Sequence, residues 1–137
     1  MPIGIFVLEI GKKKGNFQYV HNVHSSKIGI LGLGRIGLEI ANRCKAFKMD
    51  IAYHQRTKRS ELNFEFYESL IDMAEDCEIL VAIIPGGETT EKIIDERVIE
   101  AIGPTGLLVN VARGTVVDNE ALARCLKDGR QIGRAHV

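Results

Sequence analysis

The sequence predicts an α/β protein built on a doubly wound parallel β-sheet with helices on both faces. Short apolar runs alternate with segments whose apolar residues recur at helical spacing, the order that builds such sheets. The first apolar run ends in a glycine-rich turn that leads directly into a helical segment. With 137 residues, of which 45% are hydrophobic, the chain is large enough to bury one domain core. The sheet is expected to be incomplete on its C-terminal side.

The first half of the chain is expected to form two strands joined by a helix. Residues 27–31 are a short apolar run, and residues 50–54 form a second one. Between them, the segment over 35–48 places apolar side chains on one helical face: Ile36, Ile40, Cys44 and Phe47. A basic loop over 55–59 follows the second strand.

The second half repeats the alternation of helix and strand. In chain order, we expect a helix over 67–74, a strand over 78–84, a helix over 96–102, a strand over 106–110 and a helix over 118–126. The run over 78–84 is mostly apolar, as in strands buried on both faces, and Pro85 ends it. Asp118 is the expected N-cap of the last helix, and Gly129 suits its C-terminal end.

The glycine turn Gly32-Leu33-Gly34-Arg35-Ile36-Gly37 is the first feature with chemical meaning. In this pattern Gly32 permits a tight turn, Gly34 lets the backbone approach a pyrophosphate, and Gly37 lets helix and strand pack closely. The following helix offers free N–H groups and a positive dipole to the phosphates. An ordinary strand-to-helix turn that binds nothing is the alternative. The strand before the turn and the helix after it favour a dinucleotide-binding unit of the Rossmann type.

The residues after the second predicted strand bear on the choice of dinucleotide. An NAD site usually carries Asp or Glu about 20 residues beyond the glycines, where it binds the ribose hydroxyls. Here His54 and Gln55 take that place, followed by a basic stretch over 56–59. Arg56 can bind a phosphate through two parallel guanidinium N–H donors, and the Thr57 hydroxyl can add a hydrogen bond. The sequence therefore favours NADP over NAD, with a merely solvated basic loop as the alternative.

Three longer motifs follow one another along the chain: Ile30-Leu31-Gly32-Leu33-Gly34-Arg35-Ile36-Gly37, Ile84-Pro85-Gly86-Gly87-Glu88-Thr89-Thr90 and Val109-Asn110-Val111-Ala112-Arg113-Gly114. In order and spacing they resemble the D-isomer-specific 2-hydroxyacid dehydrogenases, over residues 26–130. The basic loop and the Pro-Gly-Gly variant resemble the NADP-using glyoxylate and hydroxypyruvate reductase branch of that family. The resemblance implies an oxidoreductase that transfers a hydride between NADP(H) and a small 2-oxo or 2-hydroxy acid. It also implies that the parent enzyme is a homodimer.

The same resemblance implies roles for individual residues. The implied cofactor-binding residues are Gly32, Leu33, Gly34, Arg35, Ile36, Gly37, Arg56, Thr57, Ile84, Pro85, Thr90, Val111 and Ala112. The backbone from Leu33 to Ile36 would hold the phosphates, and the pair in the basic loop would meet the 2′-phosphate. Ile84, Pro85 and Thr90 would line the adenosine and ribose, and Val111 and Ala112 would lie near the nicotinamide.

Arg113 would be the catalytic arginine, because its guanidinium can pair with the carboxylate or keto oxygen of a 2-oxo acid and polarise the carbonyl. Its place at the carboxyl end of a buried-looking strand is where ligands bind in open parallel sheets. A surface arginine without such a role is the alternative.

Two departures from the family pattern lead us to expect a fragment that is inactive alone. The family's acid–base histidine and glutamate would lie beyond the last predicted helix, and residues 1–26 are too few for its separate substrate domain. We expect 27–130 to be the dinucleotide-binding domain and 1–26 a remnant of the interdomain connection or a non-native leader. Residues 131–137 resemble a translated sequencing adapter and are expected to be an artefact, with a divergent natural ending as the alternative.

The remaining features narrow the classes of function. Eighteen basic and eighteen acidic residues balance, so no electrostatic attraction to nucleic acid or a membrane surface is expected. The three cysteines predict neither a disulfide framework nor a metal site, and without a targeting segment the cytoplasm is the expected location. Two alternatives stay open. One is a dinucleotide-binding co-repressor of the same family, which the neutral charge and basic loop disfavour; the other is a methyltransferase, which the full glycine pattern and Arg113 disfavour.

Overall fold

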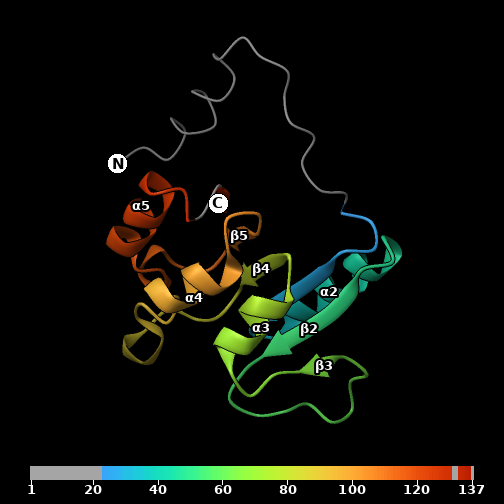
Figure 1. Cartoon of the computed structure of the whole chain (residues 1–137). Coiled ribbons are helices and arrows are strands. Elements are labelled where there is room, and N and C mark those ends of the chain that lie inside the picture. The colour runs from blue at the N-terminus through green and yellow to red at the C-terminus, as the bar shows by residue number, and fades with distance from the viewer. Residues whose placement is uncertain (1–22, 131–132, 137) are drawn as a thin grey trace.

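The computed structural model describes residues 23–130 and 133–136, and these form an α/β domain around one parallel sheet (Figure 1). Within these residues the sheet has six strands, in the spatial order β3-β2-β1-β4-β5-β6. All neighbouring strands pair in parallel. The strands are β1 (Lys27–Leu31), β2 (Asp50–His54), β3 (Glu65–Phe66), β4 (Ile79–Ala82), β5 (Leu107–Asn110) and β6 (Gly133–His136). The predicted doubly wound fold is confirmed, because this is the strand order of a dinucleotide-binding sheet.

Helices cover both faces of the sheet. They are α2 (Arg35–Ala46), α3 (Leu70–Asp76), α4 (Glu96–Ile102) and α5 (Asn119–Lys127), with short 3₁₀ turns η1 (Glu88–Thr90) and η2 (Gly114–Val116). Helix α2 packs on one face, while α3, α4 and α5 lie side by side on the other (Figure 1). No helix in the described part of the chain is long and apolar enough to cross a membrane.

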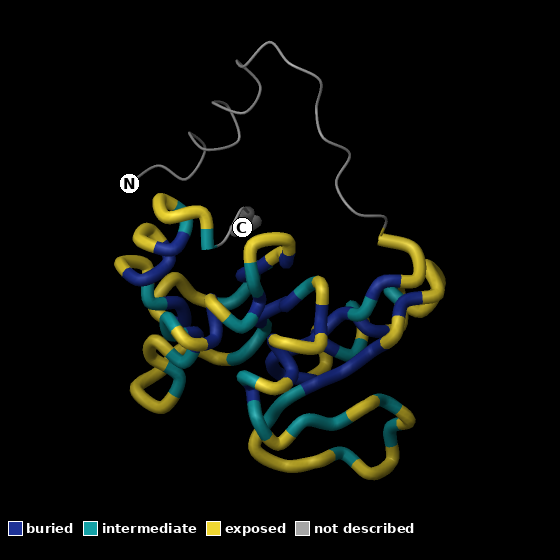
Figure 2. Tube along the Cα trace, in the orientation of Figure 1, coloured by how far each residue is buried: buried dark blue, intermediate teal, exposed yellow. Residues whose placement is uncertain are grey.

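Successive strand residues divide between two apolar clusters, one on each face of the sheet. Ile30 and Val81 belong to the cluster under α2, whereas Leu80 and Leu108 belong to the cluster under α3, α4 and α5. This alternation follows from the strand geometry, in which neighbouring side chains point to opposite faces. The central strands are consequently buried along most of their length (Figure 2).

Polar caps set the start of most helices. Ser69, Asp95 and Asp118 each accept a backbone N–H from the first turn of α3, α4 and α5, so the predicted N-cap at Asp118 is confirmed. The cap at Ser69 also explains why α3 begins at Leu70 and not near Tyr67. Tyr67 instead follows the two-residue strand β3, which is too short to leave an apolar pattern in the sequence.

The C-terminal segment adds a strand that the sequence pattern did not predict. The backbone of Gly133–His136 pairs with β5 and takes the sixth position in the sheet. Strand pairing joins backbone groups, which every residue carries, and so a sequence motif does not report it. The adapter-like origin of the segment stays a prediction. At the other end, residues 1–22 lie outside the described residues, while Asp50 N–H donates to Ser26 O and joins residue 26 to β2.

Candidate functional site

Four loops meet at the carboxyl end of the sheet. They follow β1, β2, β4 and β5, and they carry the glycine turn, the basic loop, the Pro-Gly-Gly loop and Arg113. Strands β1 and β4 are neighbours although they are not consecutive, and their following helices α2 and α4 lie on opposite faces. A crevice at such a switch point is where open α/β sheets bind ligands.

The three glycines of the turn have different surroundings. Gly32 has φ +96°, and a Cβ there would lie 2.5 Å from Ile84 Cγ2 and 2.9 Å from Ile83 O. A Cβ at Gly37 would collide with the carbonyl oxygen of Gly32. At Gly34, by contrast, a Cβ would meet nothing within 4 Å. Gly32 and Gly37 are therefore needed by the fold, whereas the lack of a side chain at Gly34 leaves one face of the turn uncovered.

The start of α2 is built to receive an anion. The first helical bond runs from Leu38 N–H to Gly34 O at 2.9 Å, so the amides of the three residues over 35–37 have no acceptor within the helix. No side chain caps this end and its first turn holds no acidic residue, unlike the first turns of α3, α4 and α5. Free amides and the helix dipole favour a phosphate group there. A dinucleotide pyrophosphate therefore fits this turn.

Leu33 has hydrogen-bond partners within the protein at both of its backbone polar atoms. Its N–H donates to Gln55 Oε1 at 3.1 Å, and its predicted part in holding the phosphates stays a prediction. Its carbonyl oxygen accepts a hydrogen bond from Arg59 Nη1 at 3.0 Å. The sequence could not show either bond, because Gln55 and Arg59 reach Leu33 only after β1 and β2 have paired.

The basic loop after β2 carries both engaged and exposed side chains. Gln55 and Arg59 contact the glycine turn, and Arg59 Nε also donates to Glu61 Oε1 at 2.7 Å. Arg56, Thr57 and Lys58 are exposed. No carboxylate lies within residues 54–60, so an added phosphate would meet positive charge and a hydroxyl but no nearby like charge in this loop.

The Pro-Gly-Gly loop packs directly against Arg113. A Cβ at Gly86 would lie 2.7 Å from Arg113 Cγ, so the absence of a side chain at 86 lets the arginine stem lie across the loop. Thr90 Oγ1 donates to Pro85 O at 2.8 Å and folds the loop back on itself. The Thr90 hydroxyl thus has a role in shaping the loop, in addition to the lining role expected from the sequence.

Asn110 is a residue whose importance the sequence did not indicate. It is 4% exposed, the last residue of β5, and its two amide atoms brace the turn that carries Arg113. Oδ1 accepts the N–H of Ala112 at 3.0 Å, and Nδ2 donates to the carbonyl oxygen of Arg113 at 3.1 Å. The sequence signal that could have indicated this role is a polar residue, Asn110, at the end of the otherwise apolar strand β5. Val111 and Ala112 are half-buried between this brace and the surface.

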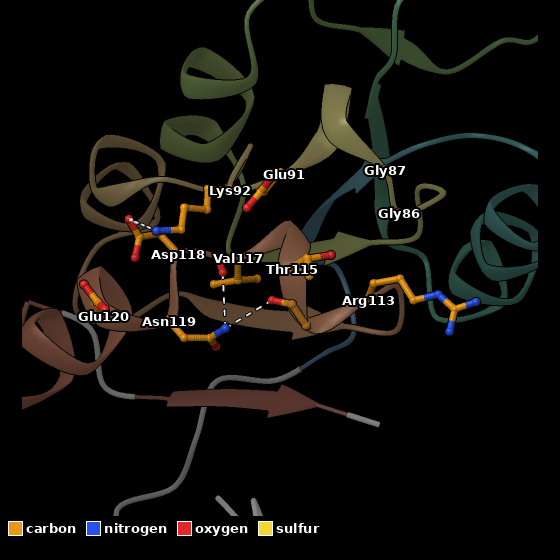
Figure 3. Close-up of a pocket in the computed structure, with 11 residues that line it drawn as sticks. Gly86, Gly87, Glu91, Lys92, Arg113, Thr115, Val117, Asp118, Asn119 and Glu120 are labelled. Atoms are coloured by element: carbon orange, nitrogen blue, oxygen red, sulfur yellow. Dashed lines mark hydrogen bonds and ion pairs between the residues drawn. The ribbon is translucent and has the colours of Figure 1, made fainter.

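A hollow of about 690 Å³ borders Arg113. It is lined by Gly86, Gly87, Glu91, Lys92, Arg113, Gly114, Thr115, Val117, Asp118, Asn119 and Glu120 (Figure 3). Arg113 is exposed, and its guanidinium points away from Lys92, Asp118 and Asn119 (Figure 3). Lys92 Nζ lies 4.0 Å from Asp118 Oδ2. Arg113 therefore contributes its stem to one rim of the hollow and leaves its charged end accessible to a ligand.

The described residues contain no group of three or more His, Cys, Asp or Glu side chains placed to hold a metal ion. The three cysteines are free, and burial raises the pKa of Cys77 to about 12, so its thiol is a poor source of thiolate.

Comparison with known protein families shows the family to which the chain belongs. The model of the D-isomer specific 2-hydroxyacid dehydrogenase NAD-binding domain matches residues 8–136. The chain belongs to this family. The glycine turn, the Pro-Gly-Gly loop and the Arg113 turn all fall within the matched residues.

Individual relatives of this dehydrogenase domain are reductases of 2-oxo acids. Glyoxylate/hydroxypyruvate reductase A of Arabidopsis thaliana is 39% identical over 123 residues, and hydroxyphenylpyruvate reductase of Plectranthus scutellarioides is 40% identical over 121. These alignments cover 90% and 88% of this chain but 39% of either relative. The chain thus spans about two fifths of the length of these relatives.

A solved structure aligns with this dehydrogenase domain. It is an NADPH-dependent glyoxylate/hydroxypyruvate reductase from Sinorhizobium meliloti, in complex with NADP and malonate, with 43% identity and a TM-score of 0.81. The alignment covers 84% of this chain and 36% of the other. The domain therefore shares its fold with a solved relative.

Proposed function

We propose that this chain is the cofactor-binding portion of an NADP-dependent 2-hydroxyacid dehydrogenase that reduces a small 2-oxo acid such as glyoxylate or hydroxypyruvate. The observation that carries the proposal is the loop after β2, where Arg56 and Thr57 are exposed and no carboxylate occupies the place that binds a ribose in NAD sites. The S. meliloti relative, which is described as NADPH-dependent, supports the choice of cofactor.

The residues present fit the cofactor. The free amides over 35–37 would bind the pyrophosphate, and the bare face of Gly34 leaves room for it. We place Ile84, Pro85 and Thr90 along the adenosine and ribose, and Val111 and Ala112 near the nicotinamide. When bound, the reduced nicotinamide supplies a hydride to the carbonyl carbon of the substrate.

Arg113 is the proposed catalytic residue of this portion. Its guanidinium is exposed at the carboxyl end of β5, and Asn110 and Gly86 set the backbone and the stem behind it. A guanidinium there can pair with the substrate carboxylate and stabilise the charge that develops on the carbonyl oxygen. The malonate in the S. meliloti complex is likewise a small carboxylate ligand.

The proton donor is proposed to lie elsewhere in the enzyme. Of the histidines whose side chains the structure describes, His54 has its Nδ1 2.9 Å from Tyr67 O and His24 has its Nδ1 2.8 Å from Ser25 Oγ, so both have a partner other than Arg113. Residues 27–130 would then be the cofactor domain, with little turnover by themselves. We further propose a homodimeric parent enzyme in the cytoplasm, a reducing compartment that suits the three free cysteines.

Titrating the full chain separately with NADPH and NADH, followed by nicotinamide fluorescence, tests the cofactor assignment. We expect tighter binding of NADPH. Arg56→Met is expected to lower NADPH affinity about tenfold or more and to leave NADH affinity nearly unchanged, because a charge-assisted phosphate contact is lost. Arg97→Met is the matched control, since Arg97 is an exposed arginine on α4 paired with Asp95. Equal or tighter binding of NADH by the unchanged chain would overturn the proposal.

A further inference from the structure

Leu33 is held at both of its backbone polar atoms by the loop that follows β2. Gln55 Oε1 accepts its N–H at 3.1 Å, and Arg59 Nη1 donates to its carbonyl oxygen at 3.0 Å. We call these two hydrogen bonds the Leu33 clasp. Leu33 itself is 1% exposed, so the clasp joins the loop to a fixed point of the glycine turn. Twenty-two residues separate Leu33 from Gln55, and 26 separate it from Arg59.

The residues of the clasp are themselves braced. Gln55 Nε2 donates to Thr57 O at 2.7 Å, so one side chain bonds both the glycine turn and the middle of its own loop. The Arg59 N–H donates to Tyr53 Oη at 2.9 Å, and the Tyr53 ring is fully buried beside Phe66. Both ends of the loop over 55–59 are therefore fixed on the core of the domain.

This bracing divides the loop into two chemical classes. Gln55 and Arg59, at the two ends, use their side-chain polar groups in hydrogen bonds to other residues of the protein. Arg56, Thr57 and Lys58, between them, are exposed and present two cations and a hydroxyl. A short loop fixed at both ends loses less conformational freedom when its exposed groups bind an anion, and this raises affinity without any new contact.

We propose that Gln55 and Arg59 are positioning residues for cofactor choice. Through the Leu33 clasp they hold Arg56, Thr57 and Lys58 beside the glycine turn, so that one dinucleotide contacts the turn with its pyrophosphate and the loop with its 2′-phosphate. The inference rests on the proposed function and deepens it, because it names the residues that couple the two phosphate sites. NADH lacks the 2′-phosphate and gains nothing from the second site.

Arg59 could instead bind the 2′-phosphate directly, and Gln55 separates the two roles. Gln55→Ala removes the acceptor of the Leu33 N–H without changing any charge. A loss of NADPH affinity in this neutral variant therefore reports positioning and not charge. Arg59→Met removes both the clasp and a charge, whereas Arg59→Lys keeps the charge and loses the planar guanidinium that also reaches Glu61.

The experiment measures NADPH and NADH affinities of the full chain and its variants, together with amide hydrogen exchange of Leu33 by NMR without cofactor. In Gln55→Ala we expect Leu33 exchange to accelerate at least about tenfold and the NADPH/NADH affinity ratio to fall about five- to tenfold, as for the loss of one or two hydrogen bonds. Arg59→Met should lower the ratio at least as much. Arg97→Met should change neither quantity, and thermal unfolding confirms that each variant is folded.

The outcomes separate the two hypotheses. If the unchanged chain binds NADPH, Arg56→Met lowers the ratio and Gln55→Ala does not, the positioning role is overturned while the proposed function stands. Unchanged Leu33 exchange in Gln55→Ala overturns the clasp itself, whether or not cofactor binds. Failure of the unchanged chain to prefer NADPH overturns the proposed function and the positioning role together. If Gln55→Ala does not fold, Gln55→Met replaces it, since it also removes the acceptor of the Leu33 N–H without adding a charge and keeps the length of the side chain; the same losses are expected and the same outcomes overturn the proposal.

Discussion

The two ends of the sheet use polar residues in opposite ways. At the amino end, Lys27 Nζ lies 2.6 Å from Glu65 Oε2, donates to Tyr67 Oη at 2.9 Å and pairs with Asp76. At the carboxyl end, the first amides of α2 have no helical acceptor, and Arg56 and Arg113 are exposed. The polar groups at the amino end satisfy one another, while these groups at the carboxyl end remain available.

The protonation of the amino-end cluster shows how completely it is satisfied. Burial lowers the pKa of Lys27, but the hydrogen bonds to Asp76 and Glu65 outweigh it and raise the pKa above its ordinary value. Burial and the bond to Asp76 raise the pKa of Tyr67 to about 12. Lys27 is therefore a permanent cation with its partners already in place. In this domain, charges indicate a ligand site at the end of the sheet where they lack protein partners, and not at the end where they are paired.

The largest expected effect comes from Gly37→Ala at the carboxyl end. Its new Cβ would collide with the backbone oxygen of Gly32, which cannot move without opening the turn. We expect a loss of about 3 kcal/mol in the free energy of unfolding, the upper range for overpacking. Urea denaturation followed by circular dichroism measures it. Unchanged stability would show that the turn is not needed by the fold.

Gly34→Ala is the matched control within the same turn. Nothing lies within 4 Å of the Cβ site, and the backbone at φ −81° and ψ −157° suits any residue. Stability should change by less than about 0.5 kcal/mol. NADPH affinity should nevertheless fall, because a methyl group would occupy the open face of the turn. A stable variant with full affinity would break the claim that this end of the sheet is kept bare for a ligand.

Asn110→Ala is expected to have an intermediate effect. It leaves the Ala112 N–H and the Arg113 carbonyl without their side-chain partner at a buried position, and we expect a loss of about 2 kcal/mol. Thermal and urea unfolding give the value, with the exposed Asn63→Ala as control. Asn110→Asp should also be destabilising: it keeps the acceptor for Ala112, but it places a carboxylate oxygen against the Arg113 carbonyl oxygen at a buried position. An effect no larger than that of the control would show that Asn110 does not support the turn.

The smallest effect is expected from Asp76→Asn at the amino end. The hydrogen bonds from Lys27 and Tyr67 hold the pKa of Asp76 below its ordinary value of 3.8. The carboxylate therefore contributes stability above that pH, and the contribution is lost as the pH falls through the lowered pKa. Because the side chain is 53% exposed, solvent screening limits the difference from the unchanged chain to less than about 1 kcal/mol at pH 7.

Urea denaturation of both proteins between pH 7 and pH 2 checks this prediction. The difference between them should shrink as the pH falls below 3.8. Glu75→Gln, at the exposed position next to Asp76, should track the unchanged chain at every pH. A difference that grows on acidification would contradict the sign of the pKa shift.

Local sequence patterns predicted the helices and strands well, because they depend on neighbours in the chain. The spacing of apolar residues located β1 and β2 with the observed bounds, and the capping carboxylate of Asp118 located the start of α5. The glycine pattern likewise indicated the turn at which α2 begins. Where the sequence was less accurate, a contact distant in the chain decided the outcome. Tyr67 was expected in a helix, but it lies against Lys27 and Asp76 outside α3.

The sequence by itself determined the fold class, the position of the glycine turn and the basic character of the loop after β2. Only the tertiary structure decided which groups at the carboxyl end are free. It placed Gln55 and Arg59 on Leu33, Asn110 behind Arg113, and the backbone of residues 133–136 beside β5. The physical reason is that helices, caps and turns follow from residues a few positions apart, whereas the satisfaction of a polar group depends on whichever atoms the folded sheet brings to it.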